Sequence, residues 1–370
     1  MTKKSTIFKE GTIKTTATVI AIAGFILAAG CPVSIHAQGI EWEVLNKEVM
    51  ELYRAGEYHC AVVVAKKVLE VAEKTVGPGH PSVAASLNNL AFLYKSEGNY
   101  AQAEALYKRA LAIREKSLDP GHPDTGMSLN NLAELYRTQG HYVQAEALYK
   151  RALAIHEKAL GPDHPSVATS LHNLALVLES QGNYAQAEAL HKRALAIYEN
   201  ALGRDHPSVA TSLNNLALFY KSESNDAEAE ALYKRALAIR EKSLGPGHPD
   251  TGMSLNNLAE LYRTQGHYVQ AEALYKRALE VLENALGPDH PDVGMILNNL
   301  AVLYETKGHY ARAEPLYRRA LAIYENALGR DHPSVATSLE NMAALYRKTG
   351  RDTEAEALEK WAATIRATPR

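Results

Sequence analysis

Cysteine, phenylalanine and tryptophan are scarce in this chain of 370 residues. Its two cysteines, Cys31 and Cys60, are too few to form a disulfide framework. With only four phenylalanines and two tryptophans, tyrosine and leucine must fill the core. The chain also has no surplus of either charge, since 40 Lys and Arg face 42 Asp and Glu. We therefore expect no nucleic-acid partner.

Recognisable catalytic motifs are also missing from the sequence. It contains no glycine-rich phosphate loop, no nucleophile elbow and no cysteine-rich metal site. Glu, Lys and His residues recur from segment to segment, which is typical of a surface pattern rather than of one active site. We expect a protein that is not an enzyme and that needs no cofactor or metal.

The first 37 residues differ from the rest in composition. Four lysines come first, an uncharged apolar run extends from Ala17 to Ala29, and Ala37 ends a small-residue cleavage site. This order predicts a secretory signal peptide over residues 1–37 and a protein that is periplasmic or secreted. The apolar run is short for a membrane span, which needs about 20 residues.

Two alternatives to cleavage after Ala37 stay open. Residues 27–31 are similar to a bacterial lipoprotein signal, in which Cys31 would carry the lipid. An uncleaved segment would instead anchor the chain, and only in these two cases would the protein contact a membrane. Cleavage would leave Cys60 alone in an apolar stretch, where we expect a buried, unpaired side chain.

The dominant feature of the chain is a repeat of 42 residues. The motif Leu-Asn-Asn-Leu-Ala, first seen at Leu87, returns in most units at this interval. A short motif does not recur so often in register by chance, so the chain is a repeat protein. Seven histidines precede a proline at the same interval: His80, His122, His164, His206, His248, His290 and His332.

Each unit is predicted to contain two helices, called here helix A and helix B. Helix A should begin at the proline of each His-Pro pair, such as Pro81, because the fixed φ of proline suits a first helical turn. Leu87 and Tyr94 belong to its apolar stripe, and Gly98 should end it. Helix B should run from about Tyr100 to Leu118. Since one pair alone would expose its stripe, the units must stack into a solenoid.

Counting outward from these units predicts eight helix pairs. Glu41 to Tyr53 becomes a degenerate first helix A, and Asp352 to Arg366 a last helix B. Glu359 replaces the core tyrosine there, as an end cap facing water should show. The predicted fold is an all-α, right-handed solenoid. Residues 38–370 form one domain, with units near 41–80, 81–122, 123–164, 165–206, 207–248, 249–290, 291–332 and 333–366.

This unit resembles the tetratricopeptide repeat. Leu87 and Tyr94 stand at signature positions of that family's helix A, and Gly98 and Tyr100 at its turn. The family's usual unit has about 34 residues, whereas the longer unit here looks like that of kinesin light chains and their bacterial relatives. The resemblance covers residues 41–366 and implies a scaffold that binds proteins or peptides.

A recurring asparagine is the most informative polar feature of helix A. Asparagine is a mediocre residue inside a helix, so its recurrence needs a reason, and its amide suits a peptide backbone. The family resemblance implies that helix A lines the concave face and that these amides hold an extended peptide. The alternative is an asparagine that bonds a neighbouring helix and ties units together. The candidate peptide-binding residues are Asn89, Asn131, Asn173, Asn215, Asn257, Asn299 and Asn341.

The histidines of the His-Pro pairs could suggest a metal site. Successive copies should lie about 10 Å apart, and ligands of one zinc ion must lie within about 2 Å of it. The copies therefore cannot converge on one ion. We expect the histidine, or a neighbouring acid such as Asp163, to cap the helix that follows.

Two features depart from even repetition. Gly121–Leu153 returns letter for letter as Gly247–Leu279, so the surfaces of these segments should be identical. The fifth unit has Ser224 and Asp226 where others have glycine and tyrosine. We expect Asn225 to adopt the left-handed turn there, in a looser joint.

Two functions compete on this basis. The leading hypothesis is a scaffold that mediates protein–protein interactions outside the cytoplasm through its concave face. The alternative is a self-assembling structural protein, because similar units and open ends could stack chains into oligomers.

Overall fold

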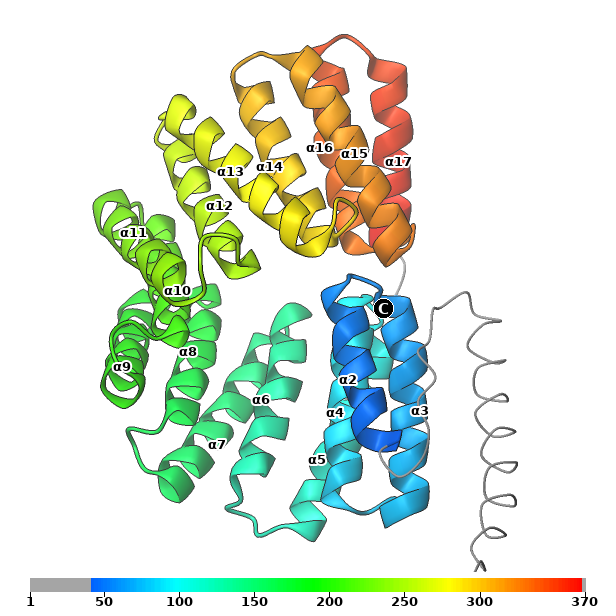
Figure 1. Cartoon of the computed structure of the whole chain (residues 1–370), viewed down its shortest axis with the longest axis vertical. Coiled ribbons are helices and arrows are strands. Elements are labelled where there is room, and N and C mark those ends of the chain that lie inside the picture. The colour runs from blue at the N-terminus through cyan, green and yellow to red at the C-terminus, as the bar shows by residue number, and fades with distance from the viewer. Residues whose placement is uncertain (1–40, 368–370) are drawn as a thin grey trace, which may run out of the picture.

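The computed structural model describes residues 41–367, which form sixteen α-helices and no strands (Figure 1). The predicted signal peptide and Cys31 lie outside these residues, so cleavage and lipidation stay predictions. Helices A are α2 (Glu41–Arg54), α4 (Pro81–Ser96), α6 (Pro123–Thr138), α8 (Pro165–Ser180), α10 (Pro207–Ser222), α12 (Pro249–Thr264), α14 (Pro291–Thr306) and α16 (Pro333–Lys348). Helices B are α3 (Tyr58–Val76), α5 (Tyr100–Ser117), α7 (Tyr142–Leu160), α9 (Tyr184–Leu202), α11 (Asp226–Ser243), α13 (Tyr268–Leu286), α15 (Tyr310–Leu328) and α17 (Asp352–Ala367).

Each helix A after the first begins at the proline of its His-Pro pair, as predicted. The histidine before it is extended, with φ −79° and ψ 144° at His80. Its Nδ1 accepts a hydrogen bond of 3.1 Å from the backbone N–H of Ser82, and all seven joints make the same bond. The prediction of a histidine cap is confirmed. Since Nδ1 accepts, the ring proton is on Nε2.

The turn from helix A to helix B requires a left-handed residue. Gly98 supplies it with φ 77°, and Ser224 takes this position in the fifth unit with φ 58°. The expectation that Asn225 would adopt the left-handed conformation is wrong, because its φ is −94°. Ser224 is the one non-glycine residue with positive φ between residues 41 and 367.

Small and aromatic side chains alternate in the core between helices. Ala91, Ala103 and Ala110 are completely buried where helices approach each other, and Tyr149 is equally buried. Larger side chains at the alanine positions would force the helices apart. The core is continuous along the chain because each helix B packs against the helix A of the next unit.

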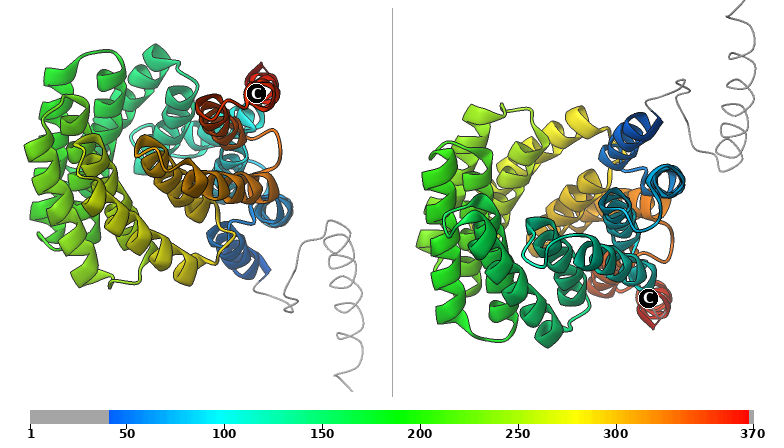
Figure 2. Two further views of the ribbon diagram at one scale, coloured as in Figure 1. Left: turned by 90° about the horizontal axis from the view of Figure 1, so that it is seen from above. Right: turned by 90° about the horizontal axis from the view of Figure 1, so that it is seen from below.

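The helix pairs wind into one turn of a superhelix. Most helices A also touch the following helix A, as α4 touches α6 and α12 touches α14, and Figure 1 shows α8 and α10 nearer the middle of the molecule than α9 and α11. The two ends meet after this turn, where α3 contacts α15 (Figure 2). The all-α solenoid fold of eight helix pairs is confirmed.

The chain ends differ in character. Arg347, at the end of α16, donates to Glu359 on α17 at 2.9 Å and both side chains are exposed, as expected of a polar cap. Near the other end, Cys60 packs at the edge of the first-unit core and is disulfide-bonded, so the expectation of an unpaired thiol is wrong. Its partner lies outside the described residues. Within 41–367, no helix is both long and apolar enough to cross a membrane.

Candidate functional site: the helix A surface

The seven predicted asparagines lie near the middle of the helices A and reach the surface. Asn89 and Asn131 are exposed, and the other five are half-buried. Asn299 donates to Asn256 Oδ1 at 2.9 Å, and Asn257 accepts a longer bond from Asn256. The side chains of the other five have no hydrogen-bond partner among the described residues. Most of the ladder is therefore open to a ligand.

The preceding asparagine of each doublet has a different role. Asn88 is buried, and its Nδ2 donates to Ser128 Oγ on the next helix A at 3.1 Å. The same bond joins Asn130 to Ser170 at 2.9 Å and Asn214 to Ser254 at 3.2 Å. The alternative of an asparagine that ties units together therefore applies to the first member of these three doublets. Within the ladder it also applies to Asn299, which bonds Asn256 on the preceding helix A.

A side chain from helix B completes this tie. Arg114 Nη1 donates to Ser128 Oγ at 2.9 Å and to the carbonyl of Asp124 at 2.7 Å. In the next unit His156 replaces the arginine, with its Nδ1 2.9 Å from Ser170 Oγ. The sequence analysis missed this polar layer, although a signal exists. Where the serine becomes Ile296, the arginine position becomes Leu282, and both are buried.

An ion-pair network occupies the C-terminal half of α6. Glu134 accepts two hydrogen bonds of 2.8 Å from Arg137 and one of 3.0 Å from Tyr149, and Lys95 lies 3.3 Å away. Burial alone would raise the pKa of Glu134, but Arg137 and Lys95 hold it at about 2. The cations on this surface are therefore neutralised.

The copied segment reproduces the network. Glu260 accepts from Arg263 at 2.8 and 2.7 Å and from Tyr275 at 2.7 Å, with Lys221 3.4 Å away. The ion-pair network is thus the same in both copies, but the asparagine doublets differ. Asn130 donates to Ser170, whereas its copy Asn256 donates to Asn257 and accepts from Asn299, so the prediction of identical surfaces holds only in part.

Apolar side chains flank the open amides. Phe92 is 41% exposed one turn after Asn89, and Leu218 is 51% exposed one turn after Asn215. Both apolar side chains therefore lie beside asparagines whose amides have no partner among the described residues.

The fourth unit contains a cluster found in no other. His172 replaces the first asparagine of the doublet, and His191 replaces the core tyrosine. Their Nδ1 atoms lie 2.9 Å apart, and His191 Nε2 lies 2.6 Å from Glu179 Oε1. Burial and the neighbouring His191 lower the pKa of His172 to about 3. Both replacements can be read from the sequence, but nothing in it indicates that the two rings meet.

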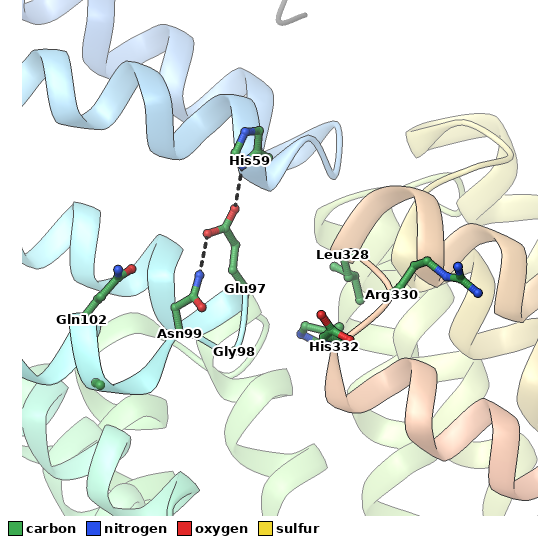
Figure 3. Close-up of a pocket in the computed structure, with 11 residues that line it drawn as sticks. His59, Glu97, Gly98, Asn99, Gln102, Leu328, Arg330 and His332 are labelled. Atoms are coloured by element: carbon green, nitrogen blue, oxygen red, sulfur yellow. Dashed lines mark hydrogen bonds and ion pairs between the residues drawn. The ribbon is translucent and has the colours of Figure 1, made fainter. Parts of the chain in front are cut away.

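A polar cavity of about 510 Å³ lies where the ends of the superhelix meet. Glu97 accepts from Asn99 at 3.1 Å and lies 3.5 Å from His59, while His332 and Leu328 line the opposite wall (Figure 3). Among the described residues, no three His, Cys, Asp or Glu side chains are placed to hold a metal ion.

A solenoid of stacked helix pairs with a repeated surface is typical of one class of protein, the interaction scaffold. The tetratricopeptide repeat family matches seven overlapping segments that together extend over residues 51–368, and the chain belongs to this family. Its fold is typically a non-enzymatic scaffold for protein–protein interactions. The matched segments are 51–116, 82–158, 124–200, 166–242, 208–284, 268–326 and 310–368.

Several solved structures are similar to this chain. BtubC (BKLC) from P. vanneervenii is 27% identical, with 66% of this chain and 92% of that chain covered and a TM-score of 0.47. A putative kinesin light chain from Podosopora anserina is 31% identical over 55% and 97%, with a TM-score of 0.45. A Rap protein complexed with Competence and Sporulation Factor is 16% identical over 89% and 98%, with a TM-score of 0.56, and shares the fold. None of the curated proteins matches.

Proposed function

We propose that this protein is a scaffold that binds an extended segment of a partner protein along its helices A, outside the cytoplasm. The observation that carries the proposal is the row of asparagine amides, five of which have no partner within residues 41–367. Each amide presents a donor and an acceptor to a peptide backbone, and Phe92 and Leu218 beside them contact its side chains.

The charges of this surface support recognition of the backbone rather than of a charged ligand. Lys95 and Arg137 are committed to Glu134, and Lys221 is committed to Glu260. An acidic partner would have to displace these pairs. The contacts between successive helices A support their placement on the concave side of the superhelix.

Substitution of the ladder tests the proposal directly. A variant with Asn131→Ala, Asn173→Ala and Asn215→Ala removes three neighbouring amides from the inner surface. The matched control carries Asn200→Ala, Asn284→Ala and Asn326→Ala, which remove exposed asparagines from helices B. Proteins are crosslinked to each form in the envelope fraction of the exporting cell and identified. We expect the ladder variant to lose partners that the control keeps, and equal capture by both would refute the ladder.

The exported location is supported by the basic and apolar segment before residue 38. Mass spectrometry of the mature N-terminus tests it. A chain that begins at Gln38 indicates cleavage, a lipid on Cys31 indicates anchoring, and an intact Met1 in the cytoplasmic fraction contradicts export.

The polar end of the solenoid favours this scaffold over self-assembly. Stacking of chains needs end helices with apolar faces, whereas α17 presents Glu359 to water, paired with Arg347 of α16. Sedimentation over a wide concentration range should give the mass of one chain, and a mass that grows with concentration would favour assembly instead.

A further inference from the structure

The seam between the two ends of the superhelix is made by a repeated contact. His332 Nε2 lies 3.1 Å from the backbone carbonyl of Ser96, at the end of α4. One unit earlier on both sides, His290 hydrogen-bonds the backbone of Arg54, at the end of α2. Because Nδ1 of each histidine accepts a helix-capping bond, Nε2 carries the proton and donates across the seam.

The other five histidines show that the seam is additional to the capping role. All of them make the same 3.1 Å capping bond. His80, His164 and His206 are nevertheless exposed, and His122 and His248 are half-buried, whereas His290 is 6% exposed. His290 is therefore buried because it contacts the first helix pair.

Close packing at Gly56 confirms this contact. A Cβ atom on Gly56 would lie 2.6 Å from Cδ of Pro291 and 3.1 Å from Cδ2 of His290. Gly140 occupies the equivalent turn in the third unit with φ 78°, and a Cβ there would meet nothing within 4 Å. The first turn is thus held by the seventh helix pair, one superhelical turn away.

The seam is small and polar, which suits a contact that opens. It joins turns and helix ends, with a small contact between α3 and α15, and the polar cavity of Figure 3 lies beside His332. Hydrogen bonds between neutral groups each add little net stability, because water competes for both partners. A contact of this kind favours one arrangement of the two superhelix ends by only a small free energy.

We propose that the seam is a latch that controls access to the inner helix A surface. When the seam is closed, the superhelix encircles that surface, and a bulky partner reaches it only after the first and last helix pairs separate. An extended segment enters along the axis without this opening. The proposal rests on the proposed function for its ligand, but the latch itself is tested without one.

The test measures access to one inner side chain in the full chain. Leu218→Cys places a thiol on the inner surface, and Val269→Cys, at a position 79% exposed on helix B, places one outside. Each is treated with N-ethylmaleimide and with a maleimide carried on a small globular protein. Peptide mass spectrometry gives the reaction rate at that residue, and the ratio of bulky to small probe rates measures access.

Two pairs of variants open the seam or leave it intact. His290→Ala with His332→Ala removes both seam bonds, and His164→Ala with His206→Ala removes two caps of the same kind elsewhere. Gly56→Val inserts a side chain into the seam, while Gly140→Val imposes the same backbone strain without a contact. We expect the access ratio at position 218 to rise roughly tenfold in the seam variants, the order expected for loss of two hydrogen bonds.

The controls and the outer thiol should keep the wild-type ratio. Small-angle scattering should show a larger radius of gyration for the seam variants alone, which separates opening from local unfolding at a lost cap. An unchanged ratio and radius in both seam variants would overturn the latch. A ladder variant that still captures every partner would refute the proposed function and leave this result standing.

Discussion

His172 and His191 form a hydrogen-bonded pair in the fourth unit, with 2.9 Å between their Nδ1 atoms. In every other unit between the first and the last, the two positions hold asparagine and tyrosine. The pair therefore places two imidazole rings in the core of the fourth unit, where burial disfavours the charged form of His172. This makes the fourth unit an acid-sensitive part of the solenoid.

Acid should destabilise the protein through His172. Its pKa is about 3 in the folded chain, because burial and His191 disfavour the charged ring, against an ordinary value near 6.5. As pH falls below 6.5, the unfolded chain binds a proton that the folded chain cannot, so the free energy of unfolding falls until about pH 3. Between pH 7 and pH 5 the loss should be about 2 kcal/mol. Denaturant unfolding at each pH measures it.

A variant that restores the common residues provides the control for this acid effect. His172→Asn with His191→Tyr recreates the pattern of the neighbouring units, and the new asparagine can donate to Ser212 as Asn130 does to Ser170. We expect this variant to lose the extra dependence on pH between 7 and 5. The same slope in both proteins would show that other groups cause it.

Replacement of Ser224 by glycine should stabilise the fifth unit. Ser224 is held at φ 58°, a conformation that costs a residue with a Cβ atom about 1 kcal/mol. Ser224→Gly should therefore raise the free energy of unfolding by about 0.5–1 kcal/mol. The reverse change, Gly182→Ser, should lower it by a similar amount. Hydrogen exchange should show residues 220–228 less protected than 94–102 in the wild type and closer to them in the variant.

Removal of one tyrosine hydroxyl should identify the contribution of the Glu134 network. Tyr149 donates to Glu134, and Tyr149→Phe leaves the carboxylate one donor short, at a cost of about 1–2 kcal/mol. Tyr107 is the equivalent residue one unit earlier, and its hydroxyl has no hydrogen-bond partner between residues 41 and 367. Tyr107→Phe should cost less than about 0.5 kcal/mol. Equal losses in thermal unfolding would mean that the network adds nothing.

Adjacent asparagines should respond in opposite ways to replacement. Asn88→Ala breaks the tie to Ser128 and leaves that buried hydroxyl with Arg114 alone, so it should cost about 1–2 kcal/mol. Asn89→Ala changes an exposed residue and should be neutral or slightly stabilising, because alanine is the better helix former. Urea unfolding of the two variants gives both values. A larger loss of stability for Asn89→Ala would show that Asn89, and not Asn88, ties the units together.

The helices were predictable from sequence because each unit carries its own start and stop signals. Pro81 and Gly98 act through backbone geometry that needs no other unit, and the same signals recur seven times. The bounds of α2 and α17 were predicted by counting outward by one unit from the clear repeats. The one wrong prediction in a turn also has a local cause. Ser224 and Asn225 are adjacent, and the register of the turn decides which of them takes the left-handed conformation.

The polar ties and the seam could not be predicted in this way. Asn88 and Asn89 are neighbours in sequence, but they point about 100° apart on the helix, so packing against the next unit decides which one is buried. The seam depends on the rotation between successive units, and a small rotation accumulates over the whole turn before His332 meets Ser96. No single unit contains that information.

The seam shows how the two copied segments are placed relative to each other. Ser96 and His332 are separated by 236 residues, or between five and six units per turn. Three units therefore carry the chain about halfway around, and Gly121–Leu153 faces Gly247–Leu279 across the axis. If the proposed function holds, we expect a partner that carries one motif twice to engage both copies, and the second engagement to gain avidity from the first without any new kind of contact.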